Sequence, residues 1–269
     1  MQEIREITVL GVPLRRSSSP EYRHSEQHSP DCPNLRRGWC RSCTCDSCRN
    51  GTITRRENGM IFSRPCRCMT IAYSRHLLEA CGLDKLAERC TFDAYLPHEG
   101  WQRGIKEKAL EYAKSWRRSS FFISGPTGCG KTHICTAICN AAVQEGASLR
   151  YFRWVEDGTR LKGMVTDAAA YKRELDSLAV CDLLYVDDLF KTDCSSADLR
   201  LAYELINSRY VAGKPVVISS ERSLSYIGGL KGRDGEAVAG RIFEMCGKGR
   251  FCLAVSGEGK NQRLLRTIR

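Results

Sequence analysis

Residues 121–132 carry the strongest structural signal in the chain, and they read Phe121-Phe122-Ile123-Ser124-Gly125-Pro126-Thr127-Gly128-Cys129-Gly130-Lys131-Thr132. The last eight satisfy the G-x-x-x-x-G-K-[ST] pattern of a phosphate-binding loop, between an expected strand and an expected helix. The glycines let backbone N–H groups turn around phosphate oxygens, and the helix N-terminus adds partial positive charge. Lys131 is expected on the β and γ phosphates, and the Thr132 hydroxyl on Mg²⁺. The predicted nucleotide contacts are Gly125, Pro126, Thr127, Gly128, Cys129, Gly130, Lys131, Thr132 and His133, although the His133 ring is expected to pack on the helix rather than to take part in chemistry.

Outward from this motif, short apolar runs alternate with longer amphipathic runs. The apolar runs predict strands over residues 121–124, 149–152, 183–186, 216–219 and 251–255. The amphipathic runs predict helices over residues 131–145, 155–178 and 196–211. This alternation is typical of an α/β fold in which helices cover both faces of a mainly parallel sheet.

Two acids follow the apolar run at residues 183–186, namely Asp187 and Asp188. Asp187 is expected to hold Mg²⁺ through water, together with Thr132, and Asp188 to orient or activate an attacking water. Adjacent acids after a buried strand can also form a simple turn, but the upstream phosphate-binding loop favours the functional interpretation. Asp188 stands where many such ATPases carry the longer Glu, which predicts slow, switch-like hydrolysis.

The N-terminal part of the chain holds a cluster of cysteines. Cys45-x₂-Cys48 and Cys66-x-Cys68 form two short-spaced pairs, an arrangement typical of a structural zinc site. Cys40-x₂-Cys43 is a rival first pair, and Cys32 is a spare thiol. Because the segment between the pairs is rich in Arg and cannot build its own core, bound Zn²⁺ is expected to organise it.

These features divide the chain into four expected parts. They are a flexible arm at 1–31, a zinc-binding docking module at 32–75, a helical linker at 76–118 and an ATPase domain at 119–269.

The charge balance indicates an anionic partner. Lys plus Arg number 42 against 31 Asp plus Glu, a formal net charge of +11, which favours nucleic acid first and an anionic membrane surface second. No apolar run approaches the ~20 residues of a membrane span, and the first residues lack the pattern of a secretory signal. The expected location is therefore the cytoplasm, where the 16 cysteines would be reduced. Neither a Gly-x-Ser-x-Gly elbow nor a His-Glu-x-x-His motif occurs, which argues against esterase and metalloprotease chemistry.

Taken together, the motifs resemble the AAA+ replicative helicase loaders of the DnaC/DnaI type, especially those encoded by phages and mobile elements. The resemblance runs from about Cys45 to the C-terminus. Beside the cysteine pairs, it rests on Phe92, Tyr95, Gly125, Lys131, Thr132 and residues 184–188, 217–221, 240–245 and 261–263.

The resemblance implies an ATPase that binds the DnaB-type hexameric replicative helicase, largely through its N-terminal part, and helps place it on single-stranded DNA. Arg241 would be an arginine finger that completes a neighbouring subunit's site and so supports self-association, and Arg263 would sense the γ phosphate. An exposed Arg in an ordinary ion pair is the alternative for Arg241. The residues expected to contact DNA lie in 155–178, where a solvated basic helix face is nearly as good an explanation: Arg160, Lys162, Lys172 and Arg173.

One position departs from the family pattern, because the polar sensor after the fourth strand is usually Asn and this chain has Ser219-Ser220-Glu221. Two alternative functions also stay open. One is an IstB-type transposition accessory ATPase, which shares the core but generally lacks the cysteine module. The other is a non-enzymatic zinc adaptor with a decayed nucleotide site, against which Lys131, Thr132, Asp187 and Arg241 all count.

Overall fold

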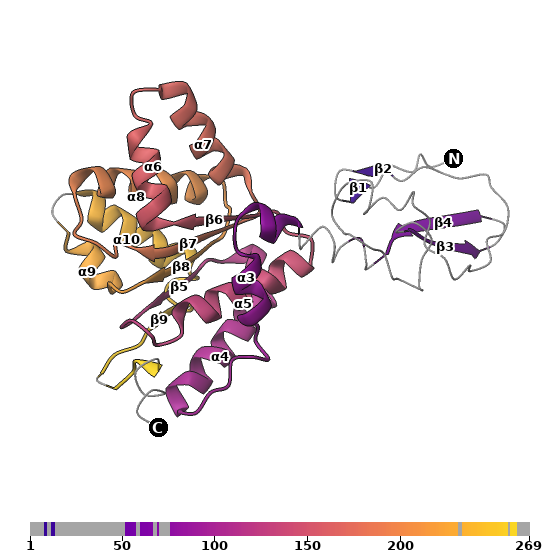
Figure 1. The fold of residues 1–269 in the computed structure, drawn as a ribbon, viewed down its shortest axis with the longest axis horizontal. Coiled ribbons are helices and arrows are strands. Elements are labelled where there is room, and N and C mark those ends of the chain that lie inside the picture. Colours follow the sequence, from indigo (N-terminus) through magenta and orange to yellow (C-terminus); the bar gives the residue numbers. More distant parts are fainter. Residues whose placement is uncertain are drawn as a thin grey trace. The chain divides into compact units, whose positions relative to one another are not determined.

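The computed structural model describes residues 8–9, 12–13, 52–57, 60–66, 69, 76–230, 233–257 and 259–262 (Figure 1). The chain divides into two compact units. One comprises Met1–Leu77 with Gln144–Gly146, and the other comprises Leu78–Val143 with Ala147–Arg269.

The first unit contains two pairs of antiparallel strands. β1 (Thr8–Val9) pairs with β2 (Val12–Pro13), and β3 (Thr52–Glu57) pairs with β4 (Met60–Pro65). Cys66 follows β4 directly and is buried.

The predicted zinc ligands fall mostly beyond what the structure describes. Within the described ranges, no three His, Cys, Asp or Glu side chains are grouped so that they could hold a metal ion. The zinc site therefore stays a prediction, because its other candidate ligands lie outside the described residues: Cys40, Cys43, Cys45, Cys48 and Cys68.

The second unit is built around a five-stranded parallel sheet. Its strands are β5 (Phe121–Ser124), β6 (Leu149–Arg153), β7 (Leu183–Leu189), β8 (Val216–Ser220) and β9 (Cys252–Ala254). They stand in the order β6-β7-β8-β5-β9, and each neighbouring pair is parallel. Every residue of β5 and β8 is buried, as expected for strands that are covered on both faces. The α/β fold and its parallel sheet are thus confirmed.

Helices cover both faces of this sheet. Figure 1 shows α3, α4 and α5 along one side and α6, α8 and α10 along the other. Their bounds are α3 (Asp84–Arg89), α4 (Gly100–Ala113), α5 (Lys131–Gln144), α6 (Trp154–Gly163), α7 (Ala168–Val180), α8 (Ser196–Val211), α9 (Leu224–Gly228) and α10 (Arg233–Met245), with a short 3-10 turn η1 (Trp116–Arg118). Among the described residues, no helix combines the length and the apolar character needed to cross a bilayer.

The segment expected as a linker, 76–118, is largely helical, and from Leu78 onward it belongs to the same unit as the sheet. The side chain of Tyr112 in α4 is fully buried, with its ring 5.2 Å from that of Phe121 and 5.3 Å from that of Phe251. These contacts attach α4 to the core by aromatic packing.

The single helix predicted over 155–178 is wrong, because the structure has two helices there, α6 and α7. A turn follows Gly163, and the Asp167 side chain then accepts a hydrogen bond from the backbone N–H of Ala170. Asp is among the residues that best cap a helix N-terminus, so Asp167 begins a new helix rather than continuing the old one. The amphipathic periodicity on either side of this turn concealed the break.

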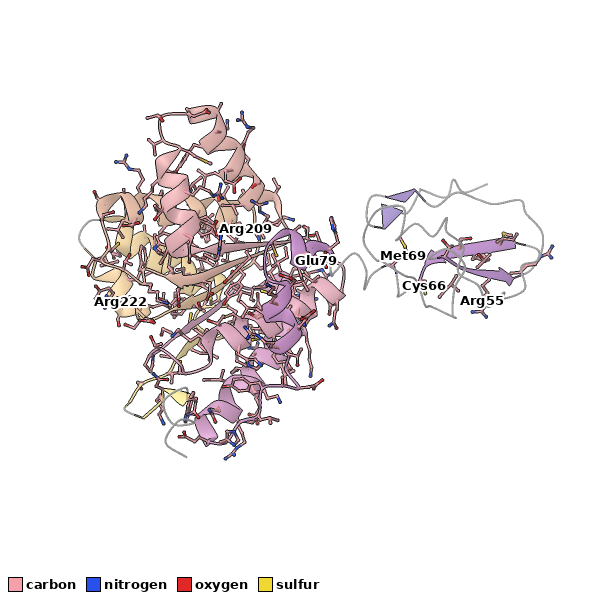
Figure 2. All side chains as sticks on the ribbon, viewed as in Figure 1. Arg55, Cys66, Met69, Glu79, Arg209 and Arg222 are labelled. Atoms are coloured by element: carbon pink, nitrogen blue, oxygen red, sulfur yellow. The ribbon has the colours of Figure 1, made fainter. Side chains whose placement is uncertain are left out.

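A buried arginine ties the elements together at the amino end of the sheet. Arg209 of α8 is 0% exposed (Figure 2). Its guanidinium donates to five backbone carbonyl groups, those of Leu178, Ala179, Cys181, Asp182 and Pro215, at 2.6–3.2 Å. One side chain therefore joins the end of α7, the start of β7 and the approach to β8.

Candidate functional site

The predicted site residues gather at the carboxyl end of the sheet. The phosphate-binding loop follows β5, Asp187 and Asp188 lie on β7, and β8 runs between these two strands. Because parallel strands end at a common edge, this order brings the loop, the acids and the end of β8 to one place.

The glycine at position 128 lies close to the C-terminal segment and has a left-handed backbone conformation that favours glycine. Its φ is +79°, and a Cβ there would lie 2.0 Å from Oδ1 of Asn261. The backbone N–H of Gln262 also donates to the Gly128 carbonyl at 3.1 Å. The C-terminal segment thus rests against the loop up to Gln262, while Arg263 lies outside the described residues.

Lys131 lies against the loop and is almost fully buried. Its Nζ donates to the carbonyl oxygens of Gly125 at 2.8 Å and Pro126 at 2.9 Å. Phosphate oxygens are stronger acceptors than carbonyl groups because they carry charge, so the ammonium can exchange these contacts for a phosphate without leaving the loop.

Asp187 is held by three hydroxyl groups. Oδ1 accepts hydrogen bonds from the Tyr185 hydroxyl at 2.7 Å and from Ser219 Oγ at 2.5 Å, and Oδ2 accepts one from the Tyr151 hydroxyl at 2.9 Å. Burial, with a smaller contribution from the Asp187 charge, raises the pKa of both tyrosines, so their hydroxyls remain protonated donors. The sequence did not indicate Tyr151, since its contact depends on the pairing of β6 with β7, whereas Tyr185 lies two residues from Asp187 on the same strand.

Asp188 has a left-handed backbone, with φ at +58°. Its N–H donates to Ser219 Oγ at 2.9 Å, and its carboxylate forms an ion pair with Lys191. The hydrogen bond to Asp188 raises the pKa of Lys191 and so keeps the ammonium charged. The carboxylate predicted to act on water is therefore neutralised by a neighbouring cation.

The end of β8 supplies three polar side chains where the family pattern has Asn. Ser219 contacts Asp187, whereas Ser220 Oγ donates to the Leu189 carbonyl at 2.7 Å. Glu221 reaches the phosphate-binding loop, where its Oε1 accepts a hydrogen bond from Thr127 Oγ1 at 2.5 Å. The residue after β8 thus contacts the loop through its carboxylate, a role that the sequence left unassigned.

Tyr95 and His133 form one wall beside the loop. His133 Nε2 lies 2.8 Å from the Thr91 carbonyl oxygen, and its ring packs edge-on against Tyr95 with centroids 5.2 Å apart. The His133 side chain is thus engaged in packing, as the residues alone suggested. The Tyr95 ring lies where a Cβ on Gly130 would be 3.1 Å away.

The Tyr95 hydroxyl is buried and makes no hydrogen bond within the described part of the chain. Burial, with a smaller contribution from Cys129, raises the pKa of Tyr95 to about 12, so the hydroxyl is a donor at neutral pH. The Tyr95 hydroxyl is thus a buried donor without a partner in the described residues, and it lies beside Gly130 of the phosphate-binding loop. Together with the Lys131 ammonium and the Thr132 hydroxyl, this donor fits a bound nucleotide phosphate. The carboxylate of Asp187 and the hydroxyl of Thr132 are likewise oxygen ligands of the kind that Mg²⁺ prefers.

Arg241, the predicted arginine finger, lies on α10 against α8 of its own chain. Its Nε donates to Asn207 Oδ1 at 2.9 Å, and the guanidinium stands 4.9 Å from the Tyr203 ring centroid and 5.6 Å from that of Tyr210. Within the described part of the chain, the contacts of Arg241 are with Tyr203, Asn207, Tyr210 and Ala237, and not with Lys131 or Asp187.

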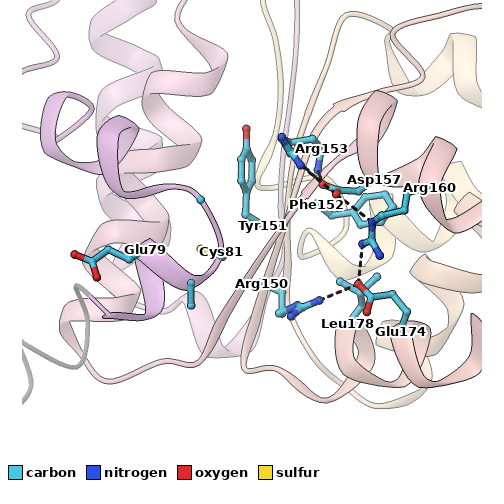
Figure 3. Close-up of a pocket in the computed structure, with 12 residues that line it drawn as sticks. Glu79, Cys81, Arg150, Tyr151, Phe152, Arg153, Asp157, Arg160, Glu174 and Leu178 are labelled. Atoms are coloured by element: carbon cyan, nitrogen blue, oxygen red, sulfur yellow. Dashed lines mark hydrogen bonds and ion pairs between the residues drawn. The ribbon is translucent and has the colours of Figure 1, made fainter. Parts of the chain in front are cut away.

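A pocket lies beside the edge strand β6, lined in part by Arg150, Arg153 and Arg160 (Figure 3). Arg150 and Arg160 both bind Oε1 of Glu174, at 3.0 and 2.9 Å. Lys162 of α6 likewise binds Asp198 at 2.5 Å. Of the four cations predicted to contact DNA, Arg160 and Lys162 are therefore paired with carboxylates, and Lys172 and Arg173 are exposed on α7.

Comparison with known proteins finds similarity to ATP-binding proteins. The family model of the IstB-like ATP binding protein matches residues 76–235. The phage-like element PBSX protein XkdC of Bacillus subtilis is 32% identical, over 75% of this chain and 79% of that protein. The replicative helicase loader DnaC of Buchnera aphidicola subsp. Acyrthosiphon pisum is 26% identical, over 62% of this chain and 69% of that protein.

Among solved structures, the crystal structure of the DnaC helicase loader is similar to this fold with a TM-score of 0.56 and 21% identity. It covers 64% of this chain and 99% of that one. These matches confirm the expected resemblance to DnaC-type ATP-binding proteins.

Proposed function

The chain belongs to the family of IstB-like ATP-binding proteins, and on this premise we propose that it is an ATP-dependent loader of the replicative helicase. It would bind the DnaB-type hexameric helicase and deliver it to single-stranded DNA. One observation carries the proposal: the glycine loop with Lys131 and the hydroxyl-held Asp187 lie at the same edge of one parallel sheet. DnaC relatives that bear the name of helicase loader supply the biological role.

The residues of the site have distinct proposed roles in ATP binding and hydrolysis. Lys131 binds the β and γ phosphates, while Thr132 and Asp187 hold Mg²⁺, which would neutralise charge that develops on the phosphates. Asp188 orients the attacking water. We expect slow hydrolysis, because Lys191 neutralises Asp188 and the Asp side chain is short. Slow turnover suits a switch, in which the ATP-bound state lasts long enough to hold a partner.

The remaining parts of the proposal concern partners. The cysteine module would hold Zn²⁺ and dock on the helicase, and Arg263 would sense the γ phosphate. Arg241 would have to leave Asn207 to complete a neighbour's site, so self-association would exchange one contact for another. The exposed Lys172 and Arg173 on α7 are the available cations for a DNA backbone.

A second function, an IstB-type transposition accessory ATPase, is favoured by the family model itself. It would use the same nucleotide site with a different partner. The two functions differ in whether the full chain binds a replicative helicase or a transposase.

The deciding experiment uses the full-length protein with Mg·ATP and purified replicative helicase. We expect a helicase complex on size exclusion, and we expect Lys131→Ala to weaken ATP binding at least about 100-fold, or about 2.7 kcal/mol. Lys214→Ala is the matched control, because Lys214 pairs with Asp182 at the opposite end of the sheet. Equal ATP affinity in Lys131→Ala and wild type would contradict the assigned nucleotide site. Binding to a transposase but not to helicase would replace the loader with the transposition function.

A further inference from the structure

We propose that Tyr151 is a positioning residue for Asp187, and that its hydroxyl fixes the carboxylate oxygen that faces the metal. The inference rests on the proposed function, since it concerns how the site holds Mg²⁺ beside a nucleotide. Tyr151 is not part of the phosphate-binding loop or of the acidic motif, and it comes from the edge strand β6.

The two oxygens of Asp187 are not equivalent. A carboxylate offers about four lone-pair sites, two on each oxygen. On Oδ1, the hydroxyls of Tyr185 and Ser219 occupy both. On Oδ2, the Tyr151 hydroxyl occupies one. Among the described residues, the remaining acceptor site is therefore on Oδ2, which makes Oδ2 the atom that could accept from a metal-bound water or bind the metal.

Strand pairing explains why Tyr151 reaches this oxygen. In the parallel pairing of β6 with β7, Tyr151 lies opposite Tyr185, and the two ring centroids are 5.1 Å apart. Residues two apart on a strand share a face, so Tyr185 and Asp187 point to the same side of the sheet. The paired tyrosine rings thus run side by side and deliver their hydroxyls to the two different oxygens of Asp187.

The hydrogen bond from Tyr151 matters because a carboxylate that binds a metal must be correctly oriented as well as charged. Groups that bind the ligands of a metal, rather than the metal itself, orient those ligands, and their loss typically costs 10–100-fold in metal affinity or activity. Tyr151 binds the oxygen that would face Mg²⁺, whereas Tyr185 and Ser219 both bind the other oxygen. Loss of the Tyr151 hydroxyl frees Oδ2 entirely, but loss of the Tyr185 hydroxyl leaves Oδ1 still held.

The test compares Tyr151→Phe with Tyr185→Phe in the full-length protein, each change removing one hydroxyl. Binding of a fluorescent nonhydrolysable ATP analogue is titrated with Mg²⁺ and repeated in EDTA. We expect Tyr151→Phe to raise the half-maximal Mg²⁺ concentration about 10-fold, with unchanged affinity in EDTA, and Tyr185→Phe to raise it less. Tyr171→Phe is the matched control, because the Tyr171 hydroxyl donates to Glu204 Oε2 at 2.6 Å on helices outside the site.

The Asp187→Asn variant distinguishes failure of the Tyr151 role from failure of the proposed nucleotide site. If wild type binds the analogue with a clear Mg²⁺ dependence that Asp187→Asn removes, while Tyr151→Phe titrates like wild type, the positioning role is overturned and the proposed site stands. A Tyr171→Phe shift as large as that of Tyr151→Phe also overturns it. If wild type binds no analogue, or Asp187→Asn keeps the full Mg²⁺ dependence, the proposed function fails and the role of Tyr151 fails with it.

Discussion

The two ends of the parallel sheet differ in how the polar side chains there are hydrogen-bonded. At the amino end, Nη1 and Nη2 of Arg209 donate to five backbone carbonyl groups of the protein itself, and only Nε of this guanidinium has no partner among the described residues. At the carboxyl end, within the part of the chain that the structure describes, the Tyr95 hydroxyl has no partner and Oδ2 of Asp187 accepts one hydrogen bond, from Tyr151.

Left-handed backbone conformations of non-glycine residues also occur next to the predicted site, although Lys248, before β9, has one as well. Asp188 and Phe190, at the carboxyl end of β7, have left-handed φ angles of +58° and +56°. Non-glycine residues in this region cost of order 1 kcal/mol or more each, and such strain concentrates at functional sites. The comparison teaches that the same strands anchor the fold at one end and leave the other end able to bind a ligand. Mutations at the amino end should therefore change stability, and those at the carboxyl end should change binding.

The largest expected effect is at the amino end. Arg209→Met should lower the free energy of unfolding by about 4 kcal/mol, because buried carbonyl groups lose their donors together. Urea denaturation followed by circular dichroism measures the loss. Nucleotide affinity of the folded variant at low temperature should stay within about twofold of wild type, since Arg209 does not touch the loop.

Arg250→Met is the control for this change. Arg250 is 63% exposed and pairs with Glu111 on the surface, where an ion pair contributes at most about 1 kcal/mol. If Arg209→Met were no more destabilising than Arg250→Met, the amino end would not be the anchor that the comparison describes.

The next effect is at the carboxyl end. Tyr95→Phe should weaken binding of both ATP and ADP about 10-fold, because a hydrogen bond to a charged group contributes about 1.5–3 kcal/mol. Isothermal titration calorimetry measures both affinities. The free energy of unfolding should not fall, since the free protein loses no hydrogen bond within the described residues.

Tyr112→Phe is a matched control for Tyr95. The Tyr112 hydroxyl is also buried without a partner in the described part of the chain, but its ring packs on Phe121 and Phe251 rather than on the loop. The Tyr112→Phe variant should therefore bind nucleotide with unchanged affinity. Equal losses in both variants, or none in either, would remove Tyr95 from the binding surface.

The smallest effect is a pH dependence at the amino end. Asp182 Oδ2 accepts hydrogen bonds from Ser148 N at 3.0 Å and Ser148 Oγ at 2.8 Å, and Oδ1 pairs with Lys214 at 3.1 Å. Burial by itself would raise the pKa of Asp182, but these contacts outweigh it and hold the pKa below its ordinary value.

A lowered pKa stabilises the fold above the unfolded value of about 4, and the contribution is lost as the pH falls through the folded pKa. Asp182→Asn should therefore be less stable than wild type by under about 1 kcal/mol at pH 7, given the exposure of the pair, and the difference should shrink below pH 4. Urea denaturation at pH 7, 4 and 3 follows this. A difference that stays constant with pH would show that the charge of Asp182 contributes nothing.

Much of the fold was open to prediction because its signals are local. The apolar runs that form β5, β7 and β8 are continuous, since both faces of these strands are buried, and the glycine loop marks where one strand ends and a helix begins. The break between α6 and α7 escaped prediction, because a single capping Asp within a periodic stretch is a weak signal.

The candidate site likewise has a part that local motifs predict and a part that they do not. From the sequence alone we predict that the chemical groups are the loop with Lys131 and the acids Asp187 and Asp188, and the sequence also shows membership of a family of ATP-binding proteins. The neighbours of these side chains are seen in the fold alone, because most of them come from distant segments whose proximity depends on strand order and register. Tyr151 reaches Asp187 through the pairing of β6 with β7, and Glu221 reaches Thr127 because β8 lies beside β5. Local sequence patterns predict strands and turns. Contacts between strands join residues that are far apart in the sequence, so local patterns do not predict them.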